Sequence, residues 1–478
     1  MTADDDHHQY HHHQQQWPSS DNTTDPPPGG AAAASPSPSR RVAYFNNAGM
    51  TALPPSVRTV GERALQYKSR PWDPPPSHDA ARDAAAVRRL FSQLIGCSGS
   101  DCSGSNSSGD GSDVVAIVPS TAFAITMAAH NLNRTGRVRP NSSILLLQDQ
   151  MPSAVYPWQE LCRVVDGLKL VVVPYPTSHD GGWTEQIVRI LKDPKTSGCN
   201  NNDVSVVCLP QCHWADGSLL DLATISRVCT ERNVALVVDA TQSIGAHPFS
   251  VQDVDADCVA CSVHKWLLGP HGASLVYVPQ RNYDSWLPLD QHDRARLCND
   301  GDLWDASMNK MHGGSVQRDG AGYPEEFDYG ARRLDAGGRP NPILLPMLRA
   351  ALEIVAEYDI EQVQATLAAV NEKVLEGARQ MGFTTTPGPR AGHILGLRPG
   401  TPELKEKLTP EEMIRIGKRL EGKGIFISVR CGAFRISPYL HTTDEEIQQL
   451  LIGLADECCD DDDTRAKFVS SNQPTTRY

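Results

Sequence analysis

The chain has 478 residues, a formal net charge of −13 and 40% apolar residues. This length predicts at least two domains, and the apolar fraction is sufficient for a substantial core. An acidic chain lacks the basic face on which nonspecific nucleic-acid binding depends, so we expect no nucleic-acid partner. No apolar run has the roughly 18–20 residues of a membrane span, and the N-terminus lacks the layout of a secretory signal. We therefore expect a cytoplasmic protein without membrane attachment.

Three polar segments stand outside the expected folded core. Residues 1–40 are rich in His and Gln and then in Pro, Ala and Ser, and such a composition cannot bury enough apolar surface to fold. Residues 96–113 consist largely of Gly, Ser and Asp, which predicts a disordered surface insertion. Residues 459–478 are interpreted as a second disordered tail. The His cluster of the first segment is interpreted as solvated chain, and we predict no metal site.

The 13 cysteines are scattered along the chain in an odd number. In a chain without a secretory signal, this distribution predicts reduced thiols rather than a disulfide framework. Cys208, Cys212 and His213 lie close enough in sequence to suggest metal ligands, but no second ligand pair lies near them. The two cysteines are therefore interpreted as small buried apolar residues.

Short apolar runs alternate with helix-length segments in the first two thirds of the chain. This alternation predicts an α/β domain with a mostly parallel, seven-stranded sheet that is flanked by helices on both faces. The last run follows its predecessor closely and is expected to lie antiparallel. The runs that predict strands are 114–118, 143–149, 168–176, 204–210, 234–240, 258–263 and 273–278, and the segments that predict helices include 79–95, 185–193 and 219–233.

After about residue 340 the pattern changes to long helices and a few short strands, which predicts a smaller α+β domain at the C-terminus. Glycines and prolines mark the boundary between the two parts. We predict an N-terminal segment (41–75) that packs with the small domain, a large domain (76–335) and a small C-terminal domain (336–458). The expected elements of the small domain are helices over 341–359 and 360–382, a strand over 393–399, a third helix, strands over 425–430 and 433–438, and a closing helix.

A lysine and an aspartate lie where two of the predicted strands end. Asp239 closes the 234–240 run, and Lys265 follows the 258–263 run. Ligands of open α/β sheets bind at the carboxyl ends of the strands. One interpretation is a lysine that forms an imine with a cofactor and an aspartate that faces a pyridinium nitrogen. The other is a buried Asp–Lys ion pair with a structural role only. Spacing alone leaves both open and slightly favours the cofactor site.

The segment "VVDATQSIGAHPFSVQDVDADCVACSVHKWLLGPHGASLVYV" (237–278) resembles the cofactor segment of the class V aminotransferase-like family. This family contains fold-type I enzymes that use pyridoxal 5'-phosphate (PLP), among them cysteine desulfurases, selenocysteine lyases and kynureninases. The resemblance joins D-x-x-Q-x-x-G to S-x-H-K about twenty residues later, which is more specific than any one short motif. It extends from "YFNNAGMTALPPSV" at Tyr44 to "FRISPYLHTTDEEIQQLLIGL" near the C-terminus, and it implies a PLP-dependent transferase fold.

The resemblance implies a role for each matching residue. Lys265 matches the Schiff-base lysine, which also moves the proton at the substrate Cα. Asp239 matches the residue that keeps the ring nitrogen protonated, and Gln242 matches the contact to the ring hydroxyl. The remaining matches bind the phosphate: Ser262 and His264 of S-x-H-K, and Ser120 and Thr121 at the strand-to-helix turn of "VPSTAFAITMAAHNL". A plain N-cap is the alternative for the Ser120–Thr121 pair, and it is compatible with phosphate binding.

Two further matches concern the ring of the cofactor. Met151 in "QMPSAVYPW" lies where desulfurases carry a histidine, so it either packs on the ring or belongs to the core. In "QCHWADG", His213 is the polar residue that best matches the family's group near the ring, and Trp214 is the alternative.

The last matches concern the substrate and the partner subunit. Arg435 matches the arginine that binds the substrate carboxylate, and Asn47 lies in the matching N-terminal segment as a further substrate contact. "ARRLDAGGRPN" resembles the loop that reaches the phosphate of the neighbouring subunit, which implies a homodimer. Gly337 and Gly338, with Arg339 beside them, would then bind in trans.

The sequence leaves the reaction open. The resemblance implies a PLP enzyme that acts on an amino-acid substrate through an external aldimine, and a transaminase-like activity is our first expectation. The alternative is a lyase that cleaves a C–S bond or another bond at Cα or Cβ, and a second alternative is an inactive scaffold of the same fold. Cys431 in "ISVRCGAFRIS" has no room for the loop that carries the nucleophilic cysteine of desulfurases, which disfavours persulfide formation.

Overall fold

The computed structural model describes residues 42–70, 72, 80–97, 111–177, 179, 181–197, 199, 203–296, 319–321, 323–338 and 340–459. The predicted tail 1–40, all of the second tail beyond Cys459 and most of the predicted insertion 96–113 lie outside these residues.

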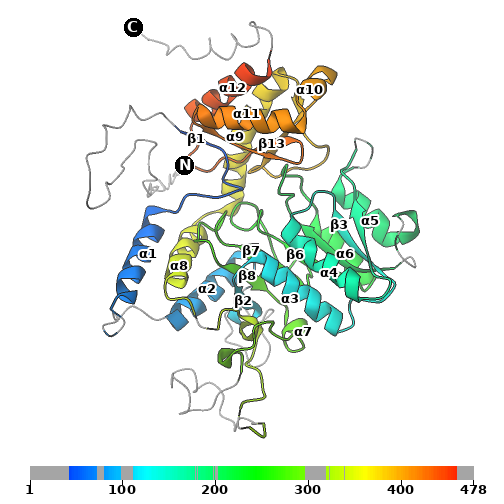
Figure 1. Cartoon of the computed structure of the whole chain (residues 1–478), viewed down its shortest axis with the longest axis vertical. Helices are drawn as coiled ribbons and strands as arrows, with labels where there is room; N and C mark the ends of the chain where they lie inside the picture. The colour runs from blue at the N-terminus through cyan, green and yellow to red at the C-terminus, as the bar shows by residue number, and fades with distance from the viewer. Residues whose placement is uncertain are drawn as a thin grey trace, which may run out of the picture.

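A seven-stranded sheet forms the centre of the larger part of the molecule (Figure 1). Its strand order is β2-β8-β7-β6-β5-β3-β4, and β3 to β7 pair in parallel. β8 pairs antiparallel with both β7 and β2, as its short connection predicts. The predicted α/β fold class is confirmed. The strands are β2 (Val115–Val118), β3 (Ser143–Leu147), β4 (Lys169–Val173), β5 (Val204–Pro210), β6 (Ala235–Asp239), β7 (Cys258–Ser262) and β8 (Ser274–Tyr277).

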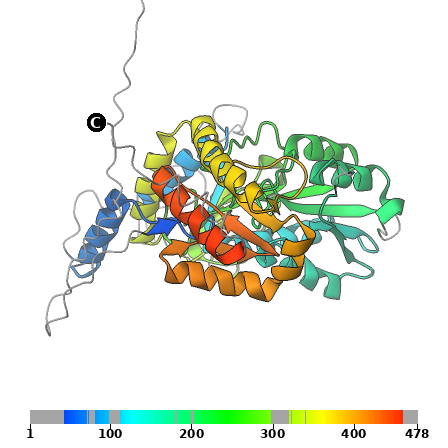
Figure 2. The ribbon, with the colours of Figure 1, turned by 90° about the horizontal axis from the view of Figure 1, so that it is seen from above.

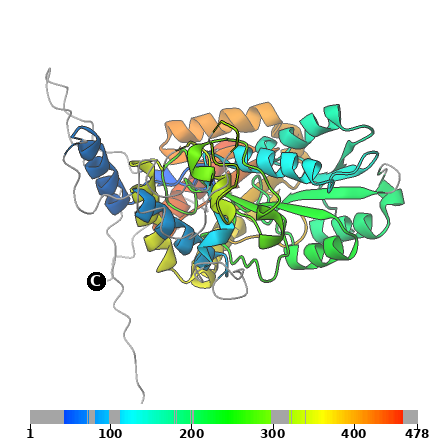
Figure 3. The ribbon, with the colours of Figure 1, turned by 90° about the horizontal axis from the view of Figure 1, so that it is seen from below.

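Helices cover this sheet on both faces, so its central strands are buried throughout. Every residue of β5 and β6 is buried, which explains why these strands are unbroken apolar runs rather than alternating ones. Figures 2 and 3 show the strands between the two helical layers. The helices of this part are α2 (Ala80–Leu94), α3 (Thr121–Arg134), α4 (Tyr156–Val164), α5 (Trp183–Lys192), α6 (Leu222–Glu231) and α7 (Gln280–Tyr283).

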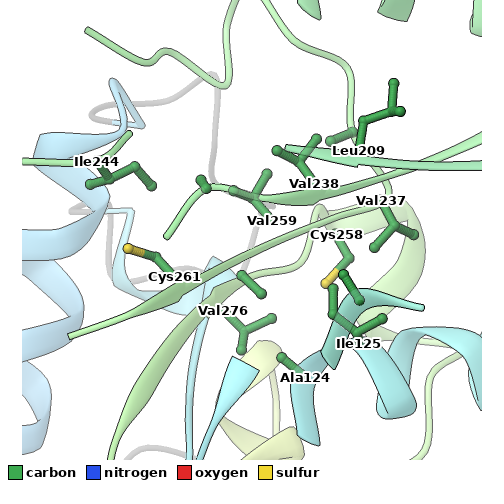
Figure 4. Packing of buried hydrophobic residues seen from close by; sticks show 14 of the residues in the cluster. Ala124, Ile125, Leu209, Val237, Val238, Ile244, Cys258, Val259, Cys261 and Val276 are labelled. Carbon is green, nitrogen blue, oxygen red and sulfur yellow. The ribbon is translucent and has the colours of Figure 1, made fainter. Parts of the chain in front are cut away.

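Helix α3 packs its apolar face against the middle of the sheet. In Figure 4, Ala124 and Ile125 of α3 lie next to Cys258 and Val276, while Val259 points to the opposite side. All five side chains are completely buried. Burial of this kind contributes about 1.5–3 kcal/mol for each large aliphatic side chain, and it fixes the first turn of α3 against the ends of β6 and β7.

The smaller part of the molecule is built on a four-stranded antiparallel sheet in the order β12-β13-β10-β9. The N-terminal strand β1 (Ala43–Tyr44) pairs in parallel with β11 (Ile425–Phe426) in a separate two-stranded sheet. The other strands are β9 (Phe383–Thr384), β10 (Leu395–Pro399), β12 (Ser428–Arg430) and β13 (Ala433–Ile436), and the helices are α10 (Pro402–Lys407), α11 (Pro410–Gly422) and α12 (Asp444–Cys458).

Helix α9 (Ile360–Gln380) spans both parts of the molecule, whereas α1 (Pro55–Lys68) and α8 (Leu344–Ala356) pack with the larger core. α1 lies beside α8 at one side of the molecule (Figure 1). Helix α9 begins against the larger core, where Val363 is buried, and ends in the smaller core, where Val374 is buried. The predicted domain boundary at 335/336 stays a prediction.

The cysteines are mostly buried free thiols. Ten of them are free in the part of the chain that the structure describes, and Cys208 and Cys212 are completely buried, in agreement with their apolar interpretation. Cys97 differs from the expectation of reduced thiols because it is disulfide-bonded. Among the described residues, no group of three or more His, Cys, Asp or Glu side chains could hold a metal ion. No helix in these residues is both long enough and apolar enough to span a membrane.

Gly217 lies where the loop after β5 contacts the segment that leads into β10. Its φ is +79°, and a Cβ there would lie 2.2 Å from the carbonyl oxygen of Ile394. Gly136 has a similar φ of +74° but open space around it. We expect Gly136→Ala to lower the free energy of unfolding by about 1–2 kcal/mol through backbone strain alone. Gly217→Ala should cost at least about 1 kcal/mol more because a backbone carbonyl must move.

Urea denaturation of both variants measures this difference. Equal losses of stability in the two variants would contradict the described packing of the loop against Ile394.

Candidate active site

The ends of β6 and β7 bring Asp239 and Lys265 to the same edge of the sheet. The parallel register places Asp239 level with Ala260, and Lys265 follows three residues after β7 ends at Ser262. Burial is the main influence on the Lys265 amine and lowers its pKa to about 8, although the charge of Asp239 acts in the opposite direction. The two residues that the sequence pairs are therefore brought together.

The protein does not supply hydrogen-bond partners for all polar atoms of this pair. Among the described residues, the Nζ of Lys265 has no hydrogen-bond or ion-pair partner. Oδ1 of the buried Asp239 accepts a hydrogen bond from the Thr241 N–H at 3.0 Å, whereas Oδ2 has no partner in the described part of the chain. Leaving a buried carboxylate incompletely paired is costly. A ligand that supplies an N–H beside Asp239 and a carbonyl beside Lys265 would satisfy both groups.

A cluster of hydroxyl groups lies next to this pair at the N-terminus of α3. The Thr121 Oγ1 lies 2.7 Å from Ser262 Oγ, 3.1 Å from Ser274 Oγ and 3.3 Å from Thr241 Oγ1. Thr121 thus ties the first turn of α3 to the ends of three strands. The unpaired N–H groups of a helix N-terminus and adjacent hydroxyls suit an anion such as a phosphate.

Ser120 is the N-cap of α3. Its Oγ accepts a hydrogen bond from the Phe123 N–H at 3.1 Å, and its side chain is exposed. The capping interpretation of Ser120 is confirmed, and phosphate binding by the same turn stays a prediction.

His264 is half-buried beside Lys265. Its ring stacks on that of His271 with 4.1 Å between the ring centroids. Burial lowers the pKa of His264 to about 4, with a further contribution from the charges of His271 and Lys265. The imidazole is therefore neutral near pH 7 and offers one N–H to an anion. From the sequence, His271 lies either near the site or merely in the turn after Lys265, with the turn favoured, and the structure brings its ring to His264.

Gln242 is held by contacts on both ends of its amide. Its Nε2 donates to the Ala48 carbonyl oxygen at 2.9 Å, and its Oε1 accepts from the Trp266 indole at 2.8 Å. Its backbone carbonyl lies 2.6 Å from His393 Nε2. The side chain is buried, so its main visible effect is to attach the N-terminal segment to the end of β6. Its contact with a ring hydroxyl stays a prediction.

Arg435 of β13 is a buried cation held by uncharged acceptors. Only 2% of its surface is exposed. Its guanidinium donates to the Ser428 Oγ at 3.0 Å, to the Trp214 carbonyl oxygen at 2.9 Å and to the Asn46 Oδ1 at 3.2 Å. No carboxylate in the described residues pairs with it. Burial and the charge of Arg430 lower the pKa of Arg435, so an anionic ligand would relieve an unfavourable environment.

Two positions in this site differ from the residues that the sequence favoured. Asn47 is completely buried and donates to the Ser437 carbonyl oxygen at 3.0 Å, whereas its neighbour Asn46 contacts Arg435. Alternating exposure along 42–47 places Tyr44 and Asn46 on the more open side, and this alternation is the signal that could have distinguished them.

In the loop after β5 it is again the adjacent residue, and not the one that the sequence favoured, that lies beside Arg435. His213 is completely buried, with its ring stacked on Trp183 at 5.8 Å between centroids and its Nδ1 3.5 Å from Asp216 Oδ1. Trp214 is partly exposed, and its indole N–H donates to the Asp149 carbonyl oxygen at 2.7 Å. The structure therefore places Trp214, the alternative of the two, beside Arg435, and places His213 behind it.

The other predicted positions lie at the rim or surface. Met151 is half-buried at the start of a 3-10 helix (Pro152–Ala154) that follows β3. Gly337 and Gly338 have φ angles of +93° and +68°, with open space where a Cβ would lie. The Gly337 N–H donates to Asp290 Oδ2 at 2.7 Å. Arg339 lies outside the described residues.

Cys431 lies in the two-residue turn of the β12–β13 hairpin. Its φ is +48° and that of Gly432 is +72°, which is the conformation of a tight type I' turn. Arg398 donates to its carbonyl oxygen at 2.7 Å and holds the turn from β10. Burial raises the pKa of the Cys431 thiol to about 11, and the nearby Asp149 carboxylate acts in the same direction. The thiol is half-buried and protonated near pH 7.

The sheet order, the lysine after β7 and the small domain that carries Arg435 define a fold-type I protein, the architecture of PLP-dependent enzymes. The sequence pattern of the family described as Aminotransferase class-V matches residues 110–321. The chain is 22% identical over 392 residues to the "Uncharacterized aminotransferase YcbU" of Bacillus subtilis (strain 168), which covers 82% of this chain and 87% of the relative. It is 23% identical over 358 residues to a cysteine desulfurase of Pectobacterium atrosepticum, with 72% and 77% covered.

Solved structures show the same fold. The apo cysteine desulfurase of Thermococcus onnurineus NA1 superposes with a TM-score of 0.65 at 17% identity, over 87% of this chain and 94% of the other. The complex of the cystine C-S lyase C-DES with its reaction product cysteine persulfide gives a TM-score of 0.68 at 19% identity, over 87% and 97%. The resemblance inferred from the sequence is confirmed: residues 110–321 match the family described as Aminotransferase class-V, and cysteine desulfurases are among the proteins to which the chain is similar.

The charge environment of Lys265 predicts its reactivity. Only a neutral amine attacks an acylating reagent, so acetylation of Lys265 by acetic anhydride should reach half its maximal rate near pH 8. Asp239→Asn removes a charge that raises the pKa and should move the midpoint to lower pH. Arg430→Gln removes a charge that lowers the pKa and should move it to higher pH. Peptide mass spectrometry across a pH series measures the rate, with the exposed Lys405 as internal reference. A midpoint that moves in neither variant would contradict this environment.

Proposed function

We propose that the protein is a PLP-dependent lyase that cleaves the C–S bond at Cβ of a cysteine-type amino acid. The observation that carries the proposal is that Asp239 and Arg435 both lie close enough to Lys265 for their charges to influence its pKa, while the protonated Cys431 thiol is held in a two-residue turn. The first three groups suit a PLP enzyme that acts on an amino acid. The fourth lacks the mobility and the charge of a persulfide-forming nucleophile.

The groups of the cleft match those of PLP. Asp239 would accept the ring N–H on its free Oδ2 and hold that nitrogen protonated. The turn at Ser120 and Thr121, together with Ser262 and the neutral His264, would bind the phosphate. When bound, PLP supplies an electron sink for the bond that breaks at Cα.

The remaining groups would act on the substrate. Arg435 would bind the α-carboxylate, with Asn46 and Ser428 fixing the direction of its guanidinium. Lys265 would remove the proton at Cα, because an amine with a pKa of about 8 is poised between its charged and neutral forms near neutral pH. The C–S bond at Cβ then breaks as the sulfur leaves.

Trp214 bounds the substrate space beside Arg435, and Met151 would pack at the cofactor ring. Gly337 and Gly338 expose backbone at the surface, which supports a homodimer in which they approach the phosphate of the partner. We place this enzyme in the cytoplasm, as its composition suggests.

Among the activities of the relatives, the hairpin favours elimination over desulfuration. The relatives named above include desulfurases and a cystine C–S lyase. A thiol with a pKa of about 11 is almost entirely protonated at pH 7, and the thiolate is the reactive form. A two-residue turn also cannot extend toward a substrate without breaking the β12–β13 pairing.

Transamination is the second candidate. The similarity to the uncharacterized aminotransferase supports it, and the same lysine, aspartate and arginine would serve it. The joint presence of these three groups in one cleft weighs against an inactive scaffold.

A product assay distinguishes these functions. The PLP-loaded protein is incubated with cysteine, cystine and S-substituted cysteines in the absence of any keto acid. We expect pyruvate and ammonia in equal amounts, together with the sulfur-containing leaving group. Turnover that requires a keto-acid acceptor would identify a transaminase and contradict the lyase proposal.

Cys431→Ser separates elimination from persulfide formation. We expect this variant to keep the wild-type rate within about threefold, since a thiol with a raised pKa takes no part in the bond cleavage. Lys265→Ala is the matched negative control and should lose at least about a thousandfold, as expected for loss of the central acid–base group. A Cys431→Ser variant as inactive as Lys265→Ala would overturn the elimination mechanism.

A further inference from the structure

The β12–β13 hairpin carries two arginines on one face. Ser428 pairs with Arg435, and Arg430 pairs with Ala433. Residues two apart on a strand point to the same side, so Arg430 lies on the face shared by Ser428 and Arg435. The hydrogen bond from Arg435 Nε to Ser428 Oγ at 3.0 Å shows that this face is the one that holds the candidate carboxylate site. Diagonal neighbours of this kind have Cβ atoms about 7–8 Å apart.

Trp214 fixes how far apart the two charges lie. The guanidinium carbons of Arg430 and Arg435 are each 5.8 Å from the centroid of the Trp214 ring. They are therefore separated by no more than twice that distance. One small molecule with two anionic groups can contact both guanidinium groups.

Arg430 has no counter-charge in the described part of the chain. Its guanidinium donates to the carbonyl oxygen of Val429 at 2.9 Å and forms no ion pair with a described residue. Asp149 and Asp216 both act on the adjacent Cys431, yet neither pairs with Arg430.

Arg398 differs from Arg430 because it has a carboxylate partner. It approaches the same turn and pairs with Asp216 at 3.5 Å. Arg430 and Arg435 therefore lack carboxylate partners among the described residues, whereas Arg398 has one.

The positive charge of Arg430 also reaches the centre of the site. It lowers the pKa of both Lys265 and Arg435. A substrate with a single carboxylate would compensate Arg435 and leave Arg430 unpaired. A second anionic group on the substrate side chain would compensate both.

We propose that Arg430 is a specificity-determining residue that binds an anionic group on the side chain of the substrate. This inference rests on the proposed function for the identity of the reaction, and it adds the class of substrate: an amino acid of the cysteine type whose sulfur substituent carries a negative charge, such as an S-carboxyalkyl cysteine. Arg435 binds the α-carboxylate, Arg430 binds the distal anion, and Trp214 packs between them.

The first experiment measures binding without turnover. Isothermal titration of the cofactor-free protein compares succinate, which has two carboxylates, with propionate, which has one. We expect succinate to bind the wild type at least tenfold more tightly than propionate, and Arg430→Gln to abolish that difference. Arg430→Lys should keep part of it, because the charge remains. Arg415→Gln removes an exposed arginine on α11 and is the matched control, with no expected effect. Equal affinities for the two ligands in the wild type would overturn the proposal.

The second experiment measures selectivity of the loaded enzyme. For S-carboxymethylcysteine, Arg430→Gln should lower kcat/KM by about 10- to 100-fold, as expected for loss of one charge-assisted hydrogen-bonded contact. For S-methylcysteine the loss should be much smaller, within about threefold. Equal losses on both substrates would contradict a role in selectivity.

The two experiments separate the claims. A protein that binds succinate through Arg430 but releases no pyruvate would contradict the lyase proposal and leave the second anion site in place. A lyase that processes S-methylcysteine and S-carboxymethylcysteine equally well would contradict the second anion site alone.

Discussion

The attraction between the Asp239 carboxylate and the Lys265 amine is the interaction on which the candidate site depends. Burial favours the neutral amine, and the carboxylate favours the charged one, so the pKa of Lys265 settles at about 8. Both residues are positioned by the parallel pairing of β6 with β7, and the strands are buried on both faces. The balance of charge is therefore set by the last residue of β6 and by the turn directly after β7. The remaining groups of the cleft are arranged around this pair.

The N-terminal segment connects the two sides of the cleft. Its strand β1 pairs with the small domain, Asn46 accepts a hydrogen bond from Arg435, and the Ala48 carbonyl accepts one from Gln242. A movement of the small domain would thus pull on the end of β6 through a few residues of extended chain. The loop after β5 makes a second connection, because Asp216 accepts a hydrogen bond from Thr386 at 2.6 Å. Although burial opposes it, contacts with His213 and Thr386 hold the pKa of Asp216 well below its ordinary value.

The large sheet and the central pair could be predicted from the sequence because they depend on local patterns. Unbroken apolar runs indicate strands buried on both faces, and ligands bind where such strands end. Asp239 and Lys265 follow directly from that rule. The partners of Arg435 could not be obtained in this way. Whether Asn46 or Asn47 reaches Arg435 depends on the register of a short strand against a segment almost four hundred residues away, which fixes the face that each side chain occupies.

The choice between His213 and Trp214 could not be made from the sequence for a similar reason. His213 was the better match because it is polar. In the structure its ring is buried against Trp183, and the indole of Trp214 lies beside Arg435. The pairing of Arg430 with Ala433 likewise cannot be predicted from the sequence, because the two-residue turn at Cys431 sets the register of the hairpin. Binding residues supplied by short strands and turns thus need tertiary structure, whereas residues at the ends of core strands do not.

Reduction with borohydride identifies the lysine to which PLP binds. The purified protein is loaded with PLP, reduced so that any imine becomes a stable secondary amine, digested and analysed by peptide mass spectrometry. We expect a single phosphopyridoxyl group, attached to Lys265, and none in Lys265→Ala. Attachment to a different lysine, or no attachment after loading, would contradict the assignment of this cleft.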